Sequence, residues 1–186
     1  MSGFTQKAIK EAFVELLNEH PLSQITVKMI VEKCGINRNS FYYHYQDIPA
    51  LIEEIIKDES EALISENPSI ASVEDAMKAA TLFASRNRTA ILHIYNSVNR
   101  DIFERYLWDV CAHIVEAYGR SIENWDKVSE FDRGILSRFY KCECFGVVIE
   151  WLNDRMETDV NAYIDRFCEL YHGMAEVMVK RCLEKK

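Results

Sequence analysis

A short polar run at positions 37–44 carries side chains that could recognise DNA. Its residues are Asn37, Arg38, Asn39, Ser40, Phe41, Tyr42, Tyr43 and His44. An arginine can donate two hydrogen bonds to guanine, an asparagine can pair with adenine, and a serine can reach a base or a phosphate. Tyrosine and histidine side chains suit phosphate contacts, which position a protein on the duplex. The run therefore predicts base recognition by residues 38–40 and backbone contacts by residues 42–44.

Two short helices must position this run. The first is predicted from apolar residues at helical spacing that follow the possible cap Thr26: Val27, Ile30, Val31 and Cys34. Gly35 then suits a turn with positive φ, and Asn37 can cap a second helix beginning at Arg38. With Ile36 and Phe41 facing inward, the polar side chains lie outside. This is a helix-turn-helix pattern, although on spacing alone an αα-corner in an ordinary helical domain explains it equally well.

The segment resembles the N-terminal domain of the TetR family of bacterial transcriptional regulators. The likeness rests on Ile25-Thr26-Val27 through Gly35, on the run from Asn37 to Tyr45, and on Leu51, and it covers about the first third of the chain. It implies an all-α fold of about nine helices, with a helix-turn-helix domain at residues 1–47 and an effector-binding and dimerisation domain at 48–186. The DNA-binding residues that we expect are Thr26, Lys28, Asn37, Arg38, Asn39, Ser40, Tyr42, Tyr43 and His44.

One position departs from the family pattern. The family usually has a lysine that touches a phosphate at the start of the fourth helix, where this chain has Ile48 followed by Pro49. The phosphate contact there would have to come from main-chain N–H groups or from Lys57 and Lys28. The Phe41-Tyr42-Tyr43-His44-Tyr45 run also resembles a subgroup that includes activators of dihydroxyacetone kinase operons, in which a protein partner is the signal.

Charge is unevenly distributed along the 186 residues. Residues 1–50 hold five basic and five acidic residues, so the net charge of -8 comes entirely from the remainder, with 17 basic and 25 acidic residues. Residues 1–50 are neutral overall and the remainder is acidic, which is consistent with docking on DNA through the N-terminal part. The N-terminal segment has no secretory signal pattern and no apolar run could span a bilayer, so we expect a cytoplasmic protein.

The six cysteines, at 34, 111, 142, 144, 168 and 182, mostly occupy apolar positions of helical patterns. We expect buried, reduced thiols, with no cofactor and no metal. Cys142 and Cys144 are two residues apart, which points them to different faces of a helix, unlike the C-x-x-C spacing of redox or zinc sites.

Apolar periodicity predicts helices along the rest of the chain. A first helix begins at Thr5, and its apolar stripe is Ile9, Ala12, Phe13, Leu16 and Leu17. Asp47 and Pro49 open a helix that runs towards Glu66 and is ended by Asn67 and Pro68. Further helices are expected at 72–83 (capped by Ser72), 89–95, 102–119, 129–152 (capped by Ser129) and 158–182 (opened by Thr158). No repeat and no convincing strand pattern occurs.

The resemblance implies two further properties. Residues 129–183, the last two helices, would form a four-helix bundle with a second copy, although their stripes could also be monomer core. The middle helices would enclose a small-molecule pocket whose occupation changes the spacing of the two DNA-binding heads. The candidate pocket residues are aromatic residues and histidines, which are also common in ordinary cores: Phe83, His93, Tyr95, Phe103, Tyr106, Trp108, His113, Trp125, Phe139 and Tyr140.

The leading hypothesis is a dimeric DNA-binding regulator, a repressor released by an unidentified small molecule, acting on a palindromic operator. The alternative is an adaptor whose C-terminal domain binds a protein partner. An enzyme is not expected, because the sequence has no pair of Glu-x-x-His motifs, no nucleophile elbow and no glycine-rich phosphate loop. The sequence does not identify the operator or the effector.

Overall fold

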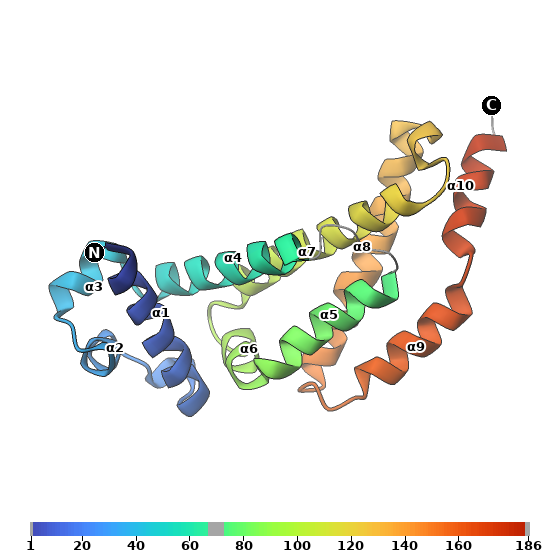
Figure 1. The fold of residues 1–186 in the computed structure, drawn as a ribbon. Helices are drawn as coiled ribbons and strands as arrows, with labels where there is room; N and C mark the ends of the chain where they lie inside the picture. Colours follow the sequence, from blue (N-terminus) through green and yellow to red (C-terminus); the bar gives the residue numbers. More distant parts are fainter. Residues whose placement is uncertain (1, 67–72, 185–186) are drawn as a thin grey trace. The chain divides into compact units, whose positions relative to one another are not determined.

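The computed structural model describes residues 2–66 and 73–184, and all regular elements in those ranges are helical (Figure 1). The α-helices are α1 (Ser2–Glu19), α2 (Val27–Cys34), α3 (Arg38–His44), α4 (Ile48–Glu66), α5 (Val73–Arg86), α6 (Arg88–Tyr95), α7 (Arg100–Ser121), α8 (Glu130–Asn153), α9 (Val160–Tyr171) and α10 (Met174–Glu184). The same ranges also contain two 3₁₀ turns, η1 (Leu22–Gln24) and η2 (Trp125–Lys127). The expected all-α fold is confirmed.

The chain divides into two compact units. The first comprises residues 1–61 and 87–106, and the second comprises residues 62–86 and 107–186. The long helices α4 and α7 contribute to both units, because the division falls within each of them. The division between residues 47 and 48 that the sequence indicates concerns the DNA-binding head, and it stays a prediction.

The first unit is built around the apolar stripe of α1. All five residues expected on that stripe are buried, and Ile9 and Phe13 are at most 1% exposed. Ile30 of α2, Phe41 of α3 and Leu51 of α4 complete the same core and are each 0% exposed. Since fully burying such a side chain contributes about 1.5–3 kcal/mol, this shared core holds α3, a helix too short to be stable alone.

The second unit has two smaller apolar clusters. One joins Val110, Ile114 and Ala117 of α7 to Leu63 and Ile64 of α4. The other lies where the end of α7, η2 and α10 meet, and its buried members are Ile122, Val128, Ala175 and Val179. Helix α5 packs along α9, where Lys78 Nζ lies 2.7 Å from Asp165 Oδ1.

The helix expected at 158–182 is divided in the structure. It begins one residue after its cap Asp159, ends at Tyr171 and resumes at Met174, as the break between the two red segments of Figure 1 shows. Gly173 has φ of +76° there, in the left-handed region that glycine reaches without a Cβ penalty. The apolar period continues across the break, which is why the pattern indicated a single helix. The described residues therefore form ten α-helices, against the expected nine or so.

A second difference concerns Gly119, which the sequence places at the end of a helix. In the structure α7 continues to Ser121, and Gly119 lies under the indole ring of Trp125. A Cβ on Gly119 would lie 2.8 Å from Trp125 Cε2, so glycine serves close packing here. The expected cap Ser72 and the helix end at Asn67 and Pro68 lie outside the described residues.

Within residues 2–66 and 73–184, no helix combines the length and the hydropathy needed to cross a lipid bilayer.

Candidate nucleic-acid interface

Local hydrogen bonds fix the angle between α2 and α3. Thr26 Oγ1 accepts a hydrogen bond from Met29 N at 3.3 Å, which caps α2. Gly35 adopts φ of +70°, and Ile36 N donates to Val31 O at 3.0 Å, which ends α2. Asn37 Oδ1 then accepts from Ser40 N at 2.8 Å, which caps α3. The sequence-predicted caps and glycine turn are thus present, and they set the direction in which α3 projects.

One face of α3 is buried and the opposite face is open. Phe41 is 0% exposed, whereas Tyr42 is 54% and Tyr43 is 81% exposed. Arg38 and Asn39 are exposed, and Ser40 and His44 are half-buried. Among the described residues, Arg38 has no ion-pair partner within 4.0 Å. An exposed, uncompensated guanidinium beside an amide at a helix N-terminus can donate to base edges or phosphates.

The other predicted DNA-binding residues lie around this face. Thr26 and Lys28, at the start of α2, are both exposed. Lys28 Nζ is 3.7 Å from Glu32 Oε1, with both side chains more than 60% exposed, so this ion pair is weak and leaves the ammonium available. Because the Asn37 oxygen caps α3, only its amide N–H groups are free to contact a ligand.

The position that departs from the family pattern is explained by packing. Ile48 is half-buried against the core of the first unit, whereas Pro49 is exposed in the first turn of α4. Asp47 Oδ1 caps this helix by accepting from Ala50 N at 2.8 Å. The apolar Ile48 therefore extends the core at the position where the family usually has a lysine. A phosphate contact by Lys28 or Lys57 instead of that lysine stays a prediction.

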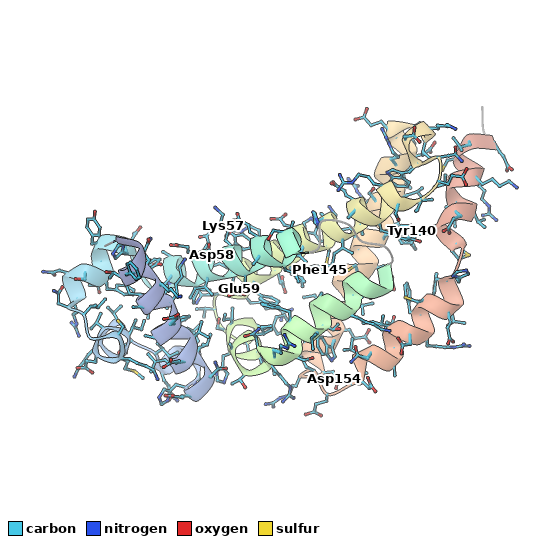
Figure 2. The ribbon with its side chains drawn as sticks, viewed as in Figure 1. Lys57, Asp58, Glu59, Tyr140, Phe145 and Asp154 are labelled. Carbon is cyan, nitrogen blue, oxygen red and sulfur yellow. The ribbon has the colours of Figure 1, made fainter. Side chains whose placement is uncertain are left out.

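Behind α3, sequence reasoning missed a polar cluster that connects α1 to α4. Lys10 Nζ lies 2.7 Å from Glu54 Oε1 and 2.5 Å from Asp58 Oδ2, and Asp58 is labelled on α4 in Figure 2. The Tyr45 side chain, 2% exposed, lies beside them, and its hydroxyl has no hydrogen-bond partner in the described part of the chain. Lys10 lies more than 30 positions before the other three residues in sequence, so no local pattern could have indicated the cluster.

Burial controls the titration of this cluster. Desolvation raises the pKa of Tyr45 to about 12; Lys10 lowers it and Glu54 raises it further. Desolvation lowers the pKa of Lys10, but hydrogen bonds to Asp58 and Glu54 outweigh this and leave that pKa raised. Both groups therefore keep their neutral-pH charge states in the folded protein well into the alkaline range.

We predict that Tyr45→Phe removes part of the alkaline sensitivity of folding. The ordinary phenol pKa of 10.0 applies to the unfolded chain, and the folded value is about 12. The stabilisation from the neutral phenol is complete below pH 10 and is lost as pH rises towards 12, because the unfolded chain releases its proton first. Urea unfolding followed by circular dichroism should show a shallower decline for Tyr45→Phe between these pH values. Tyr43→Phe, at an exposed phenol, is the matched control and should behave as wild type.

The second unit has a cavity of about 940 Å³, open to solvent, between α5, α7, α8, α9 and α10. Of the residues predicted to form an effector pocket, only Tyr140, labelled on α8 in Figure 2, lines it. The sequence did not indicate the other lining residues, among them Glu143, Cys144, Phe167 and Glu176, because no local pattern distinguishes a residue that borders a cavity from one on an ordinary helix face.

Four of the other nine predicted pocket residues lie in the first unit. Tyr95 is 2% exposed and packs edge-on against Phe103, with ring centroids 6.1 Å apart. His93 Nδ1 is 2.7 Å from Leu17 O, which ties α6 to α1. Tyr106 donates a long hydrogen bond of 3.4 Å to Glu53 Oε1 on α4. These four side chains pack within the first unit.

The remaining five lie in the second unit but do not line this cavity. Trp108 packs edge-on against Phe145, with Lys141 Nζ 4.3 Å from the Trp108 ring centroid. Trp125 covers Gly119, and Phe139 is 60% exposed. His113 is half-buried, and its Nε2 has no hydrogen-bond partner within the described residues. Phe83 is half-buried on α5. The assignment of these residues to an effector site stays a prediction.

Two of the six cysteines, Cys111 and Cys144, contact each other as thiols. A hydrogen bond between Cys111 on α7 and Cys144 on α8 lowers the pKa of Cys144 and raises that of Cys111. Cys142 is exposed whereas Cys144 is half-buried, so the two thiols lie on different faces of α8, as their spacing predicts. No three His, Cys, Asp or Glu side chains among the described residues are grouped so that they could hold a metal ion.

An apolar stripe runs along the outer face of α8. Phe131 is 78%, Ile135 53% and Phe139 60% exposed, at successive steps of four residues. The exposed Cys142 and Gly146 extend the same face by two more turns. Large exposed apolar residues aligned on one helix face mark an interaction surface rather than a solvated helix.

Two family models match the chain. One described as "Bacterial regulatory proteins, tetR family" matches residues 9–55, and one described as "Transcriptional regulator C-terminal region" matches residues 72–173. The first includes all of α2 and α3, and the second, which alone covers more than half of the chain, includes most of the cavity lining.

Curated proteins with similar sequences are named as regulators. The chain is 25% identical over 181 residues, covering 91% of this chain and 45% of the other, to "Uncharacterized HTH-type transcriptional regulator YxbF" of Bacillus subtilis (strain 168). It is 33% identical over 66 residues, covering 36% of this chain and 35% of the other, to "HTH-type dhaKLM operon transcriptional activator DhaS" of Lactococcus lactis subsp. lactis (strain IL1403). The chain spans less than half the length of these relatives.

Two solved structures share the fold. The "Dihydroxyacetone kinase operon activator DhaS" superposes with a TM-score of 0.73 at 17% identity, over 93% of this chain and 97% of that one. A TetR transcriptional regulator from Rhodococcus sp. RHA1 gives 0.56 at 18% identity, over 89% and 95%. At these identities the likeness concerns the fold alone.

Proposed function

Because the chain belongs to the TetR family of bacterial transcriptional regulators, we propose that it binds a palindromic operator as a homodimer and releases it when a small molecule occupies the second unit. The family is not an enzymatic one, and its helix-turn-helix domain implies DNA binding. The operator, the dimer and the effector are the parts of the proposal that go beyond family membership.

The observation that carries the proposal is the open face of α3. This helix is capped at both ends and anchored by the fully buried Phe41, while Arg38 and Asn39 project into solvent. A recognition helix in the major groove contacts bases through residues near its N-terminus. Arg38, Asn39 and Ser40 are therefore proposed to read bases, and Asn37, Tyr42, Tyr43, His44, Thr26 and Lys28 to contact the backbone.

Dimerisation is supported by the apolar stripe of α8. One α3 helix can read only a few base pairs, so useful specificity requires a twofold pair of heads. The stripe offers a face on which a second copy could bury Phe131, Ile135 and Phe139. The exposed glycines 134 and 146 on this helix would permit close approach of a neighbouring helix.

The first candidate mode of action is repression released by the effector, because a dimer seated on a promoter excludes polymerase without needing a further contact. Activation is the second candidate, and it is favoured by the relative and the solved structure named as activators. Either mode acts on chromosomal DNA, so the protein is proposed to work in the cytoplasm. A promoter-reporter fusion measured with and without the gene distinguishes a rise from a fall in transcription.

Selection of duplexes from a random pool by the purified full-length chain tests the proposal. We expect enrichment of an inverted repeat whose half-sites are separated by about one helical turn of 10–10.5 base pairs or a multiple. Enrichment of nothing, together with recovery of a protein partner in pull-downs, would instead support the adaptor with a protein-binding C-terminal domain.

A further inference from the structure

Two thiols meet between α7 and α8 in the second unit. A hydrogen bond joins the side chains of Cys111 and Cys144, and the packing around them agrees with this contact. Trp108, one turn before Cys111, packs edge-on against Phe145, which is labelled in Figure 2, with ring centroids 5.2 Å apart. Lys141 Nζ lies 4.3 Å from the centroid of the Trp108 ring. Because Lys141 and Phe145 flank Cys144 on α8, the two thiols lie where other side chains already hold the helices together.

The two thiols differ in their access to solvent. Cys111 is 1% exposed, whereas Cys144 is half-buried and lines the cavity that is open to solvent. A small reagent in that cavity therefore reaches Cys144, while the surrounding core shields Cys111. A reachable cysteine with a second cysteine beside it is the arrangement in which oxidation of the first is resolved by the second.

The contact also favours reaction at Cys144. The thiolate is the nucleophilic form of cysteine, and the hydrogen bond from Cys111 lowers the pKa of Cys144, although burial and the charge of Glu143 oppose this. The pKa of Cys111 is raised by its hydrogen bond to Cys144 and by burial, against the charge of Lys141, which lowers it. Cys144 is therefore the attacking thiol, and Cys111 is the thiol that reacts second.

We infer that Cys111 and Cys144 form a peroxide-reactive dithiol that closes to a reversible disulfide between α7 and α8. The Cys144 thiolate attacks one oxygen of hydrogen peroxide: the S–O bond forms, the O–O bond breaks, and the hydroxide that leaves takes a proton from solvent to become water. The Cys111 thiol then attacks the sulfenic acid sulfur of Cys144: the S–S bond forms, the S–O bond breaks, and a second water leaves with the Cys111 proton. The two thiols lose two electrons, and the peroxide gains them.

The disulfide would restrict a helix to which both units contribute. Helix α7 begins in the first unit and continues in the second, where the bond would fix it to α8. In reducing compartments disulfides are usually transient and serve catalysis or redox sensing. An effect on transcription rests on the proposed regulatory function, whereas the formation of the bond does not.

Counting free thiols by mass spectrometry tests the inference. The reduced full-length chain is treated with hydrogen peroxide, unfolded and labelled with N-ethylmaleimide. We expect six adducts before oxidation and, with two thiols consumed, four after it, while dithiothreitol restores all six. Trypsin together with a protease that cleaves after Glu143 separates Cys142 from Cys144, so the linked peptides should identify Cys111 and Cys144 as the bonded pair.

Three variants assign the roles of the thiols. Cys144→Ser should retain all five of its remaining thiols under peroxide. Its matched control is Cys142→Ser, which removes an exposed thiol two positions away and should still lose two thiols as wild type does. Cys111→Ser should accumulate sulfenic acid on Cys144, which dimedone labels in the folded protein, whereas wild type should show little labelling. If circular dichroism shows that serine at the buried position 111 disturbs the fold, the other two variants decide.

Several results would overturn the inference. They are six labelled thiols after peroxide, a loss of thiols that dithiothreitol does not reverse, and equal retention of thiols in Cys142→Ser and Cys144→Ser. A bond to Cys168, which lines the same cavity, would also contradict the assigned pair. The assay uses no DNA, and operator binding is measured separately on the selected duplex. The proposed regulator and the dithiol can therefore fail independently.

Discussion

Arg38→Ala is expected to weaken binding to the selected duplex by at least about tenfold while leaving the fold intact. A bidentate contact between arginine and guanine contributes about 1–3 kcal/mol of discrimination, and a dimer loses one contact in each half-site. The side chain is exposed and has no ion-pair partner among the described residues, so its loss leaves no buried group unsatisfied. Fluorescence polarisation at fixed salt measures the affinity, and circular dichroism checks the fold.

The control for this substitution is Lys180→Ala on α10. It removes the same charge from an exposed side chain that forms only a 3.9 Å pair with Glu184. Its affinity for the duplex should equal that of wild type. If both variants lost affinity equally, the effect would be one of net charge; if neither did, α3 would not be the reading helix.

Phe139→Glu is expected to convert the proposed dimer to a monomer. The substitution places a carboxylate on the apolar stripe of α8, where association would have to bury it without a partner. The folded monomer should tolerate the change, because Phe139 is 60% exposed in the single chain. Once the two heads are no longer linked, affinity for the inverted repeat should fall by about a hundredfold or more, since each half-site is then bound independently.

Sedimentation velocity and duplex binding together measure this effect. Ala62→Glu is the control, because it adds the same charge at an exposed helical position on α4. That variant should remain dimeric and bind DNA normally. A Phe139→Glu protein that stayed dimeric would show that another face, such as the one carrying Leu170 and Val177, forms the contact.

The helix-turn-helix could be predicted because its determinants are local. The caps Thr26 and Asn37 and the turn at Gly35 bond within three to five residues of themselves, so a short window of sequence contains the whole cause. The same holds for Asp47, which caps α4 at the position that the sequence indicated. Burial of the α1 stripe was also foreseen, because an apolar period of one helix face has few alternatives.

The determinants of the cavity are not local, and the sequence indicated its lining poorly. Aromatic periodicity does not distinguish a residue that closes a core, such as Tyr95, from one that borders a cavity, such as Tyr140. The cluster of Lys10, Tyr45 and Glu54 depends on the packing of α1 against α4, which no pattern within either helix specifies. For the same reason the division at Gly173 was hidden beneath an uninterrupted apolar period.

The insertion of α3 into the major groove is tested most directly by methylation interference on the selected duplex. Methylation of guanine N7 lies in the major groove, and methylation of adenine N3 lies in the minor groove. The proposed geometry of Arg38 and Asn39 predicts that N7 methylation blocks binding at two clusters of bases related by twofold symmetry, while N3 methylation at the same half-sites does not. Tight binding that was indifferent to N7 methylation in both half-sites would contradict recognition by this helix.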